Sequence, residues 1–135
     1  MKKDYKKWML EKAGINNDKV RPFFHEREVW FTSMGENIGF EQDGGGEKFL
    51  RPVLIFKKFN NEVIWALPLT RTDKKSKYYF NISINDNEAS VNNRQSVVIL
   101  SQIRLVDAKR LQYKIGTINE NEFAKLKGAL LALLK

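Results

Sequence analysis

Three short apolar runs, rich in β-branched residues, constrain the fold of this chain more than any other feature. They span residues 52–56, 63–67 and 97–100. Runs of this length and composition are typical of strands buried on both faces, whereas a buried helix would need about ten or more residues. The three runs therefore predict a mainly β core.

Other segments predict strands on both sides of these runs. Residues 28–32 carry β-branched and aromatic side chains, and residues 78–84 alternate apolar with more polar side chains. Such alternation indicates a strand with one buried face. Residues 110–117 predict one more strand. The pair Asn60-Asn61 predicts a hairpin between the first two runs, because Asn tolerates the left-handed backbone conformation of tight turns.

The last segment of the chain predicts an amphipathic helix. Asn119 and Glu122 have capping-box spacing, and Ile118 and Phe123 stand where a hydrophobic staple closes the first turn. The apolar stripe that follows comprises Phe123, Leu126, Leu130, Leu133 and Leu134. Several short strands followed by one helix predict a small curved barrel with that helix packed against it.

Three further segments predict one helix and two loops. Residues 4–13 place apolar side chains at helical spacing beneath lysines, which predicts a short amphipathic helix near the start of the chain. Residues 35–50, which include three consecutive glycines, and the polar tract 85–95 predict long loops. Trp8, Trp30 and Trp65 lie within apolar patterns, so we expect all three in the core.

Size, charge and cysteine content narrow the possible functions. The 135 residues correspond to one domain, and 24 Lys and Arg against 16 Asp and Glu give a formal charge of +8. This charge favours an anionic partner such as RNA or an acidic protein. The chain has no cysteine, which excludes disulfides and thiolate metal sites. We expect a cytoplasmic protein, because no run is long enough to span a membrane or to form a secretory signal.

Polar and charged side chains gather at the ends of the predicted strands. The candidates for chemistry or RNA contact are Glu41, Gln42, Arg51, Thr70, Ser101, Gln102 and Arg104. The segments 41–56, 66–70 and 101–107, in this order and ahead of a final amphipathic helix, resemble the PemK/MazF family of toxin endoribonucleases. The resemblance extends over roughly residues 27 to 133.

The resemblance implies a fold, an activity and partners. Residues 27–135 are expected to form an SH3-like small β-barrel with the C-terminal helix, and residues 1–26 a helical extension packed on it. The expected activity is metal-independent cleavage of single-stranded mRNA at a short sequence, through a 2′,3′-cyclic phosphate and without any cofactor. The expected partners are a second copy of the chain, in a homodimer, and an acidic antitoxin that covers the site.

Arg51 and Thr70 are the expected catalytic residues. Cleavage without a metal requires positive charge on the phosphorane, and the planar guanidinium of Arg51 holds a phosphate in bidentate fashion. Pro52 restricts Arg51 to an extended conformation. The resemblance implies that Arg51 acts in catalysis and that Thr70 donates a hydrogen bond to the scissile phosphate. The structural alternatives are a surface ion pair for Arg51 and a local turn bond for Thr70.

The proton acceptor and the RNA contacts have alternatives. Arginine, with a pKa above about 12, is a poor base. Some members of the family carry an aspartate where this chain has Ser101, so the base is either Glu41 or water.

The expected RNA-binding residues are Glu41, Gln42, Ser101, Gln102 and Arg104, since amide and carboxylate groups read base edges in single strands. Arg104 is alternatively an ion-pair partner of Asp107.

Two other functions fit the same fold. Gyrase-poisoning toxins share the barrel without cutting RNA, and a catalytically decayed family member would bind RNA only. Arg51 and Thr70 favour the nuclease, because a protein-binding barrel has no need of that pair.

Overall fold

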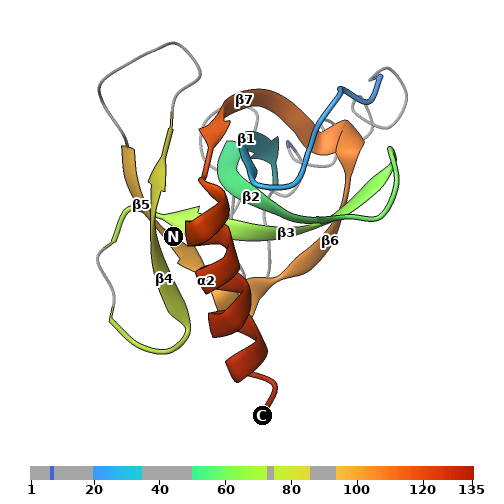
Figure 1. Ribbon diagram of the computed structural model, residues 1–135. Helices are drawn as coiled ribbons and strands as arrows, with labels where there is room; N and C mark the ends of the chain where they lie inside the picture. Colours follow the sequence, from blue (N-terminus) through green and yellow to red (C-terminus); the bar gives the residue numbers. More distant parts are fainter. Residues whose placement is uncertain (1–6, 8–19, 35–49, 73–74, 86–93) are drawn as a thin grey trace.

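The computed structural model describes residue 7 and residues 20–34, 50–72, 75–85 and 94–135 (Figure 1). Glu41, Gln42, the glycine run, Trp8 and, apart from residue 7, the helix predicted over residues 4–13 lie outside the described residues. The described chain contains seven strands, two 3-10 turns and one longer helix. They are β1 (Glu28–Ser33), β2 (Leu50–Lys58), β3 (Val63–Thr70), β4 (Tyr79–Ile84), β5 (Arg94–Ile99), η1 (Leu100–Gln102), β6 (Arg104–Asp107), η2 (Ala108–Arg110), β7 (Leu111–Thr117) and α2 (Glu120–Ala132).

All strand pairs are antiparallel, and the strands follow the order β4-β5-β3-β2-β1-β7. β3 pairs with β6 along its first half and with β5 at its end. An isolated bridge between Asn85 and Thr117, with backbone hydrogen bonds of 2.8 and 2.9 Å, joins the end of β4 to β7. The fold is therefore a mainly β antiparallel sheet with a C-terminal helix.

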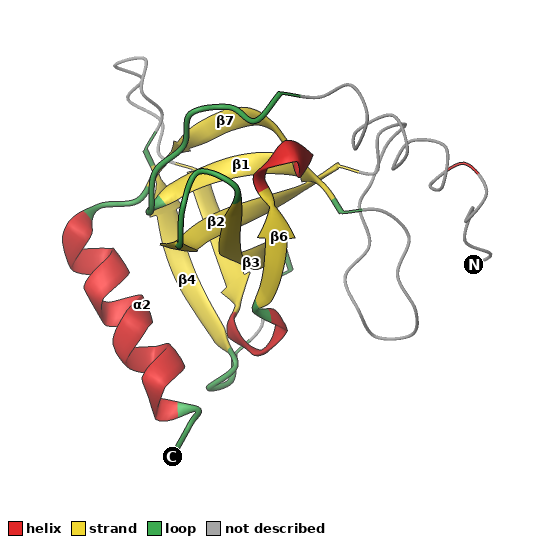
Figure 2. Cartoon of the chain, turned by 90° about the vertical axis from the view of Figure 1, so that its right-hand side faces the viewer, coloured by secondary structure: helices red, strands yellow, loops and turns green. Residues whose placement is uncertain are grey.

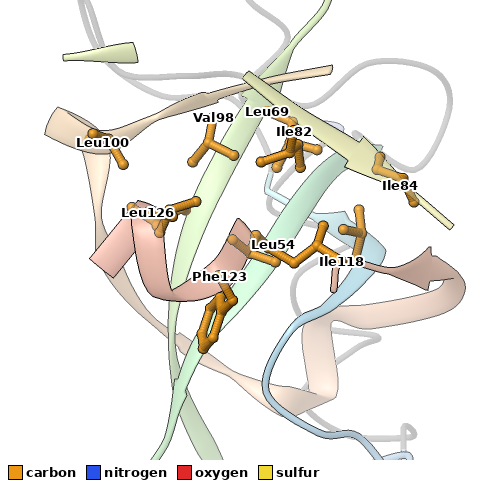
Figure 3. Packing of buried hydrophobic residues seen from close by; sticks show 11 residues of the cluster. Leu54, Leu69, Ile82, Ile84, Val98, Leu100, Ile118, Phe123 and Leu126 are labelled. Atoms are coloured by element: carbon orange, nitrogen blue, oxygen red, sulfur yellow. The ribbon is translucent and has the colours of Figure 1, made fainter. Parts of the chain in front are cut away.

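Each central strand contributes to two hydrophobic clusters, because successive side chains point to opposite faces. The helix-side cluster lies beneath α2 and comprises Val29, Leu54, Leu67, Leu69, Ile82, Ile84, Val98, Leu100, Ile118, Phe123 and Leu126 (Figure 3). The second cluster comprises Phe24, Trp30, Met34, Val53, Ile55, Ile64, Ala66, Val106, Ala108 and Leu111. The two clusters explain why the central apolar runs lack a strict alternation.

The hairpin between β2 and β3 forms where the Asn pair predicts it, for a different physical reason. The side-chain oxygen of Asn60 accepts hydrogen bonds from the backbone N–H groups of Glu62 and Val63, at 2.7 and 2.9 Å. Among the described non-glycine residues, only Arg27 has a positive φ, at 75°. Asn60 thus shapes the turn through its side chain and not through a left-handed backbone.

Helix α2 begins as predicted and lies along one side of the strands (Figure 2). The Asn119 side chain accepts the N–H of Glu122 at 2.7 Å, and Ile118 and Phe123 are buried in the helix-side cluster. The Glu122 carboxylate accepts the backbone N–H of Ser83 in β4, at 2.8 Å, and so fixes the helix to that strand. The predicted stripe is wrong at Leu134, which lies beyond the helix and is 81% exposed.

The segment before β1 is attached to the strands by both apolar and ionic contacts. Phe24 is buried in the second cluster, and the ammonium of Lys58 donates to its carbonyl oxygen at 2.9 Å. Arg21 donates two hydrogen bonds to the Asp107 carboxylate, at 3.0 and 2.9 Å. These contacts join residues 21–24 to β2 and to the end of β6.

Other differences from the sequence prediction concern short or mixed segments. Strand β6 was not predicted, because its four residues RLVD carry charge at both ends. Arg94 and Gln95 belong to β5, and Leu50 belongs to β2, although all three fall in predicted loops. Trp30 is buried as expected, but Trp65 is 41% exposed, so its placement in the core was wrong.

Candidate active site

A pocket of about 430 Å³ lies on the face of the strands that α2 covers only in part. Its apolar lining includes Leu69 and Ile84, which also belong to the helix-side cluster. The complete lining is formed by Phe31, Arg51, Pro52, Leu69, Thr70, Arg71, Thr72, Ile84, Arg94, Gln95, Ser96 and Ile115. The pocket thus borders the buried face of the sheet and adds polar side chains beside it.

The pairing of β2 with β3 explains why Arg51 and Thr70 both line this pocket. Val53 is opposite Pro68 in this antiparallel pair, so the first residues of β2 lie beside the last residues of β3. Arg51 is the second residue of β2, and Thr70 is the last of β3. The structure therefore brings together the two residues that the sequence predicts as catalytic.

The local hydrogen bonds of Thr70 orient its hydroxyl group. Its side-chain oxygen accepts the backbone N–H of Thr72 at 3.2 Å, and its carbonyl oxygen accepts the hydroxyl of Ser96 at 3.3 Å. The first bond is the local turn bond that we considered as the alternative role. It occupies a lone pair of the oxygen and leaves the hydroxyl hydrogen to donate. The turn bond is therefore compatible with donation to a ligand oxygen.

All the charged side chains that line the pocket are arginines. Arg51, Arg71 and Arg94 line it, and the described lining residues include no Asp or Glu. Arg71 and Arg94 are exposed and form no ion pair with other described residues. Such a group of guanidinium side chains with hydroxyl and amide neighbours favours a phosphate or another anion.

Ser101, Gln102 and Arg104 lie elsewhere on this chain. They belong to η1 and to the start of β6, and they are not among the residues that line the pocket. Arg104 pairs in register with Ala66, four residues before Thr70 on β3. The structure thus separates these three predicted RNA-binding residues from Arg51 and Thr70 within one chain.

The alternative ion pair between Arg104 and Asp107 is wrong. Asp107 is bound by Arg21 in bidentate geometry and by the backbone N–H of Lys109 at 2.9 Å. Burial alone raises the pKa of Asp107, but these hydrogen bonds outweigh it and the pKa is lowered. Burial, together with the guanidinium of Arg104, lowers the pKa of Arg110. Arg104 therefore adds to a positively charged surface.

Five polar residues of the pocket were not predicted from the sequence: Arg71, Thr72, Arg94, Gln95 and Ser96. Two signals in the sequence point to them. Arg71 and Thr72 directly follow Thr70, and the other three directly precede the apolar run at residues 97–100. The second position was overlooked because residues 85–95 were predicted to be a loop, whereas strand β5 begins at Arg94.

Neither a metal cluster nor a membrane helix is found in the described part of the chain. There, no group of three or more His, Cys, Asp and Glu side chains lies together. No described helix is long and apolar enough to cross a membrane.

An antiparallel β fold with arginines and a threonine at neighbouring strand ends is the kind of scaffold that suits an anionic ligand. Residues 27–134 match the family described as PemK-like, MazF-like toxin of type II toxin–antitoxin system. Endoribonuclease EndoA from Bacillus subtilis (strain 168) is 30% identical over 108 residues, which cover 76% of this chain and 87% of that protein.

Solved structures share the fold at lower sequence identity. An endoribonuclease in complex with its cognate antitoxin, from a mycobacterial species, has a TM-score of 0.59 at 16% identity, covering 83% of this chain and 95% of the other. MazF (Form-I) from Deinococcus radiodurans has a TM-score of 0.58 at 18% identity, covering 85% and 97%. The chain thus belongs to the PemK-like, MazF-like family, as an endoribonuclease toxin of a type II toxin–antitoxin system.

Proposed function

We propose that this toxin cleaves single-stranded mRNA at a short specific sequence without a metal ion, using Arg51 and Thr70 in the pocket described above. The observation that carries the proposal is the pocket itself. It holds Arg51 and Thr70 beside Arg71 and Arg94, with no carboxylate among its described lining residues. A phosphodiester is the group in RNA that such a site favours.

The proposed reaction is an internal transfer at phosphorus. The ribose 2′-oxygen forms a bond to phosphorus, the bond to the 5′-oxygen breaks, and the products carry a 2′,3′-cyclic phosphate and a 5′-hydroxyl. Arg51 stabilises the negative charge that develops on the phosphorane. The Thr70 hydroxyl donates to a non-bridging phosphate oxygen. The base that takes the 2′-proton is Glu41 or water, since Ser101 offers no carboxylate, and water supplies the proton that the departing 5′-oxygen takes up.

We also propose how the chain is organised around this site. Residues 27–135 form an SH3-like barrel, supported by the bridge between Asn85 and Thr117 that links β4 to β7. Residues 1–26 form an extension packed on the barrel, supported by buried Phe24 and by the ion pair of Arg21 with Asp107.

The proposed partners follow from the positive charge and the family. An acidic antitoxin neutralises the toxin by covering the arginine-lined pocket, and the formal charge of +8 supports such a partner. The active form is a homodimer. It acts in the cytoplasm, where mRNA is available.

The test is cleavage of a long RNA by the purified protein in EDTA. Arg51→Ala should slow cleavage by a factor on the order of 10² to 10³, because the transition state loses a charged donor. Lys125→Ala is the matched control: Lys125 is an exposed cation on α2, away from the pocket, and its loss should leave the rate unchanged. Circular dichroism verifies that both variants are folded. RNA binding without cleavage by the parental protein would favour the decayed module, and the absence of both would favour the gyrase poison.

A further inference from the structure

An aromatic pair beside the pocket has no role in the chemistry proposed above. Phe31 of β1 lines the pocket, and Tyr113 of β7 is directly opposite Phe31 in the strand register. The two ring centroids are 4.9 Å apart with an interplanar angle of 35°. Phe31 is partly buried, whereas Tyr113 is 52% exposed. The pair therefore extends an apolar surface from the pocket toward solvent.

Strand geometry places Tyr113 on the same face as the pocket. Phe31 lines the pocket, and the ring of Tyr113 contacts that of Phe31 directly across the strand pair, so the two side chains share a face. Phe31 is also opposite Pro52 of β2, another lining residue. Tyr113, Phe31 and Pro52 thus form a row across three adjacent strands, about 10 Å from end to end. Arg51 directly precedes Pro52 at one end of this row.

A purely structural role accounts for only part of this arrangement. A cross-strand aromatic pair stabilises the pairing of β1 with β7. That role requires the face of Tyr113 that contacts Phe31, but not the half of its surface that is exposed. Single-stranded RNA is commonly held by aromatic rings that stack on bases while cationic side chains bind the phosphates. The pocket and the pair offer these two elements side by side.

We propose that Tyr113, supported by Phe31, stacks on a base of the RNA strand adjacent to the phosphate bound at Arg51. The ligand of this subsite is an unpaired nucleobase. Stacking tolerates any base, because every base has a π face, so Tyr113 contributes to affinity more than to sequence choice. This subsite rests on the RNA cleavage proposed above and adds a contact outside the reacting atoms.

The experiment compares Tyr113→Ala, Tyr113→Phe and the parental protein on a short RNA that spans a cleavage site mapped by primer extension on a long RNA. Tyr113→Ala should raise KM on the order of 10-fold while kcat stays within about twofold, since stacking holds substrate without touching the reacting atoms. Tyr113→Phe should behave as the parent. Tyr78→Ala is the matched control, because Tyr78 is 44% exposed and is not among the lining residues.

Abasic nucleotides identify the contact itself. Removing the stacked base from the RNA, at one position beside the cleavage site, should lower the affinity of the parental protein on the order of 10-fold. The same abasic RNA should not lower the affinity of Tyr113→Ala any further. The stacking site would be overturned if Tyr113→Ala had the same KM as the parental protein. It would also be overturned if every abasic position lowered the affinity of both proteins equally. Tyr113→Val, which suits a strand, replaces the alanine variant if thermal unfolding shows that it is unfolded.

Failure of this proposal and failure of the proposed function are distinguishable. Anisotropy of the same labelled oligonucleotides gives Kd, so the comparison does not depend on turnover. If folded Arg51→Ala cleaved RNA at the parental rate, Arg51 would have no part in the mechanism, whatever the result for Tyr113. Loss of cleavage in Arg51→Ala together with unchanged affinity in Tyr113→Ala would leave the proposed chemistry in place and overturn only the stacking site.

Discussion

The hydroxyl of Thr70 makes a local bond in this structure and has a proposed role in catalysis, and the two roles use different parts of the group. Its oxygen accepts the N–H of Thr72 at 3.2 Å, while its hydrogen is left to donate to the scissile phosphate. The turn bond thereby aligns the donor. The methyl group of Thr70 takes no part in either bond.

The expected result is that Thr70→Val loses most activity while Thr70→Ser retains much of it. Loss of one positioned donor to a developing oxyanion lowers kcat on the order of 10²-fold. Valine has the shape of threonine, so circular dichroism and thermal unfolding should change little. Initial rates on the same RNA in EDTA provide the measurement. Equal activity of the valine and serine variants would assign Thr70 to turn formation alone.

Glu28 is a buried carboxylate with several donors around it. Its side chain is 9% exposed, and it accepts the indole N–H of Trp30 at 2.9 Å and the backbone N–H of His25 at 2.8 Å. The ammonium of Lys114 lies 3.1 Å from its other oxygen. Burial raises the pKa of Glu28, but these hydrogen bonds and the ammonium outweigh it, so the pKa is lowered. Glu28 thus links the turn before β1 to β1 and β7.

Stability should therefore depend on pH through Glu28. Because the folded pKa lies below the unfolded value of about 4.3, the contribution of the carboxylate is present above that pH and is lost as the pH falls through the folded pKa. Glu28→Gln should lower the free energy of unfolding by about 1–3 kcal/mol at pH 7, and by less at pH 3. Urea unfolding at both pH values measures this. Glu120→Gln, at an 85% exposed side chain, is the control. A deficit that does not change with pH would contradict the argument.

At the scale of residues, the sequence identifies polar side chains at strand ends but not their long-range partners. Arg51 and Thr70, which the family resemblance singles out, stay predicted catalytic residues, and the structure places both of them in the lining of one pocket. The partner of Asp107 could not be predicted, since Arg21 lies 86 positions away in the sequence and only the tertiary fold brings the two together. Arg94 was missed because a polar strand start looks like the end of a loop.

The bridge that links β4 to β7 depends on a glycine. A Cβ atom added to Gly116 would lie 2.3 Å from the carbonyl oxygen of Asn85 and 2.8 Å from a methyl carbon of Ile84. Both contacts are far too close, and the first involves backbone, which cannot rotate away. Only glycine lets the two strands approach here, and Ile84 also lines the pocket.

Gly116→Ala should separate these strand ends and destabilise the protein by about 1–3 kcal/mol. Gly128 in α2 offers a matched control, because a Cβ added there would meet nothing within 4 Å. Gly128→Ala should stabilise by about 0.5–1 kcal/mol through helix propensity. Chemical unfolding of both variants gives the two signs, and amide exchange at Asn85 and Thr117 reports the bridge. Slow exchange and full stability in Gly116→Ala would show that the strands accommodate the methyl group without separating, and would contradict this prediction.

At the scale of elements, periodicity predicts the strands and α2, while pairing geometry determines the rest. The strands that contribute most to the buried clusters were predicted, because apolar runs and alternation report burial directly. β6 has only four residues, and only its register opposite β3 identifies it as a strand. The bridge at Asn85 joins residues distant in the sequence, which no local pattern encodes.

The described chain presents its predicted catalytic residues and its predicted RNA-binding residues on two separate regions. Arg51 and Thr70 line the pocket, whereas Gln102 and Arg104 do not. One RNA strand can contact both regions in a compact site if a second copy supplies one of them. The exposed cross-strand neighbours Trp65 and Leu105, at 41% and 59% exposure, leave apolar surface on the strands that a second copy could cover.

We therefore expect a homodimer in which the Arg51 and Thr70 of one protomer act with Gln102 and Arg104 of its partner. Light scattering at micromolar concentration should give about twice the monomer mass. The sharper test mixes two inactive variants, Arg51→Ala and a Gln102→Ala, Arg104→Ala double variant, after unfolding and refolding them together. Half of the dimers are then mixed, with one of two composite sites intact, so about a quarter of the parental activity should return. A monomer that cleaves RNA, or a mixture as inactive as its components, would show that one chain holds the whole site.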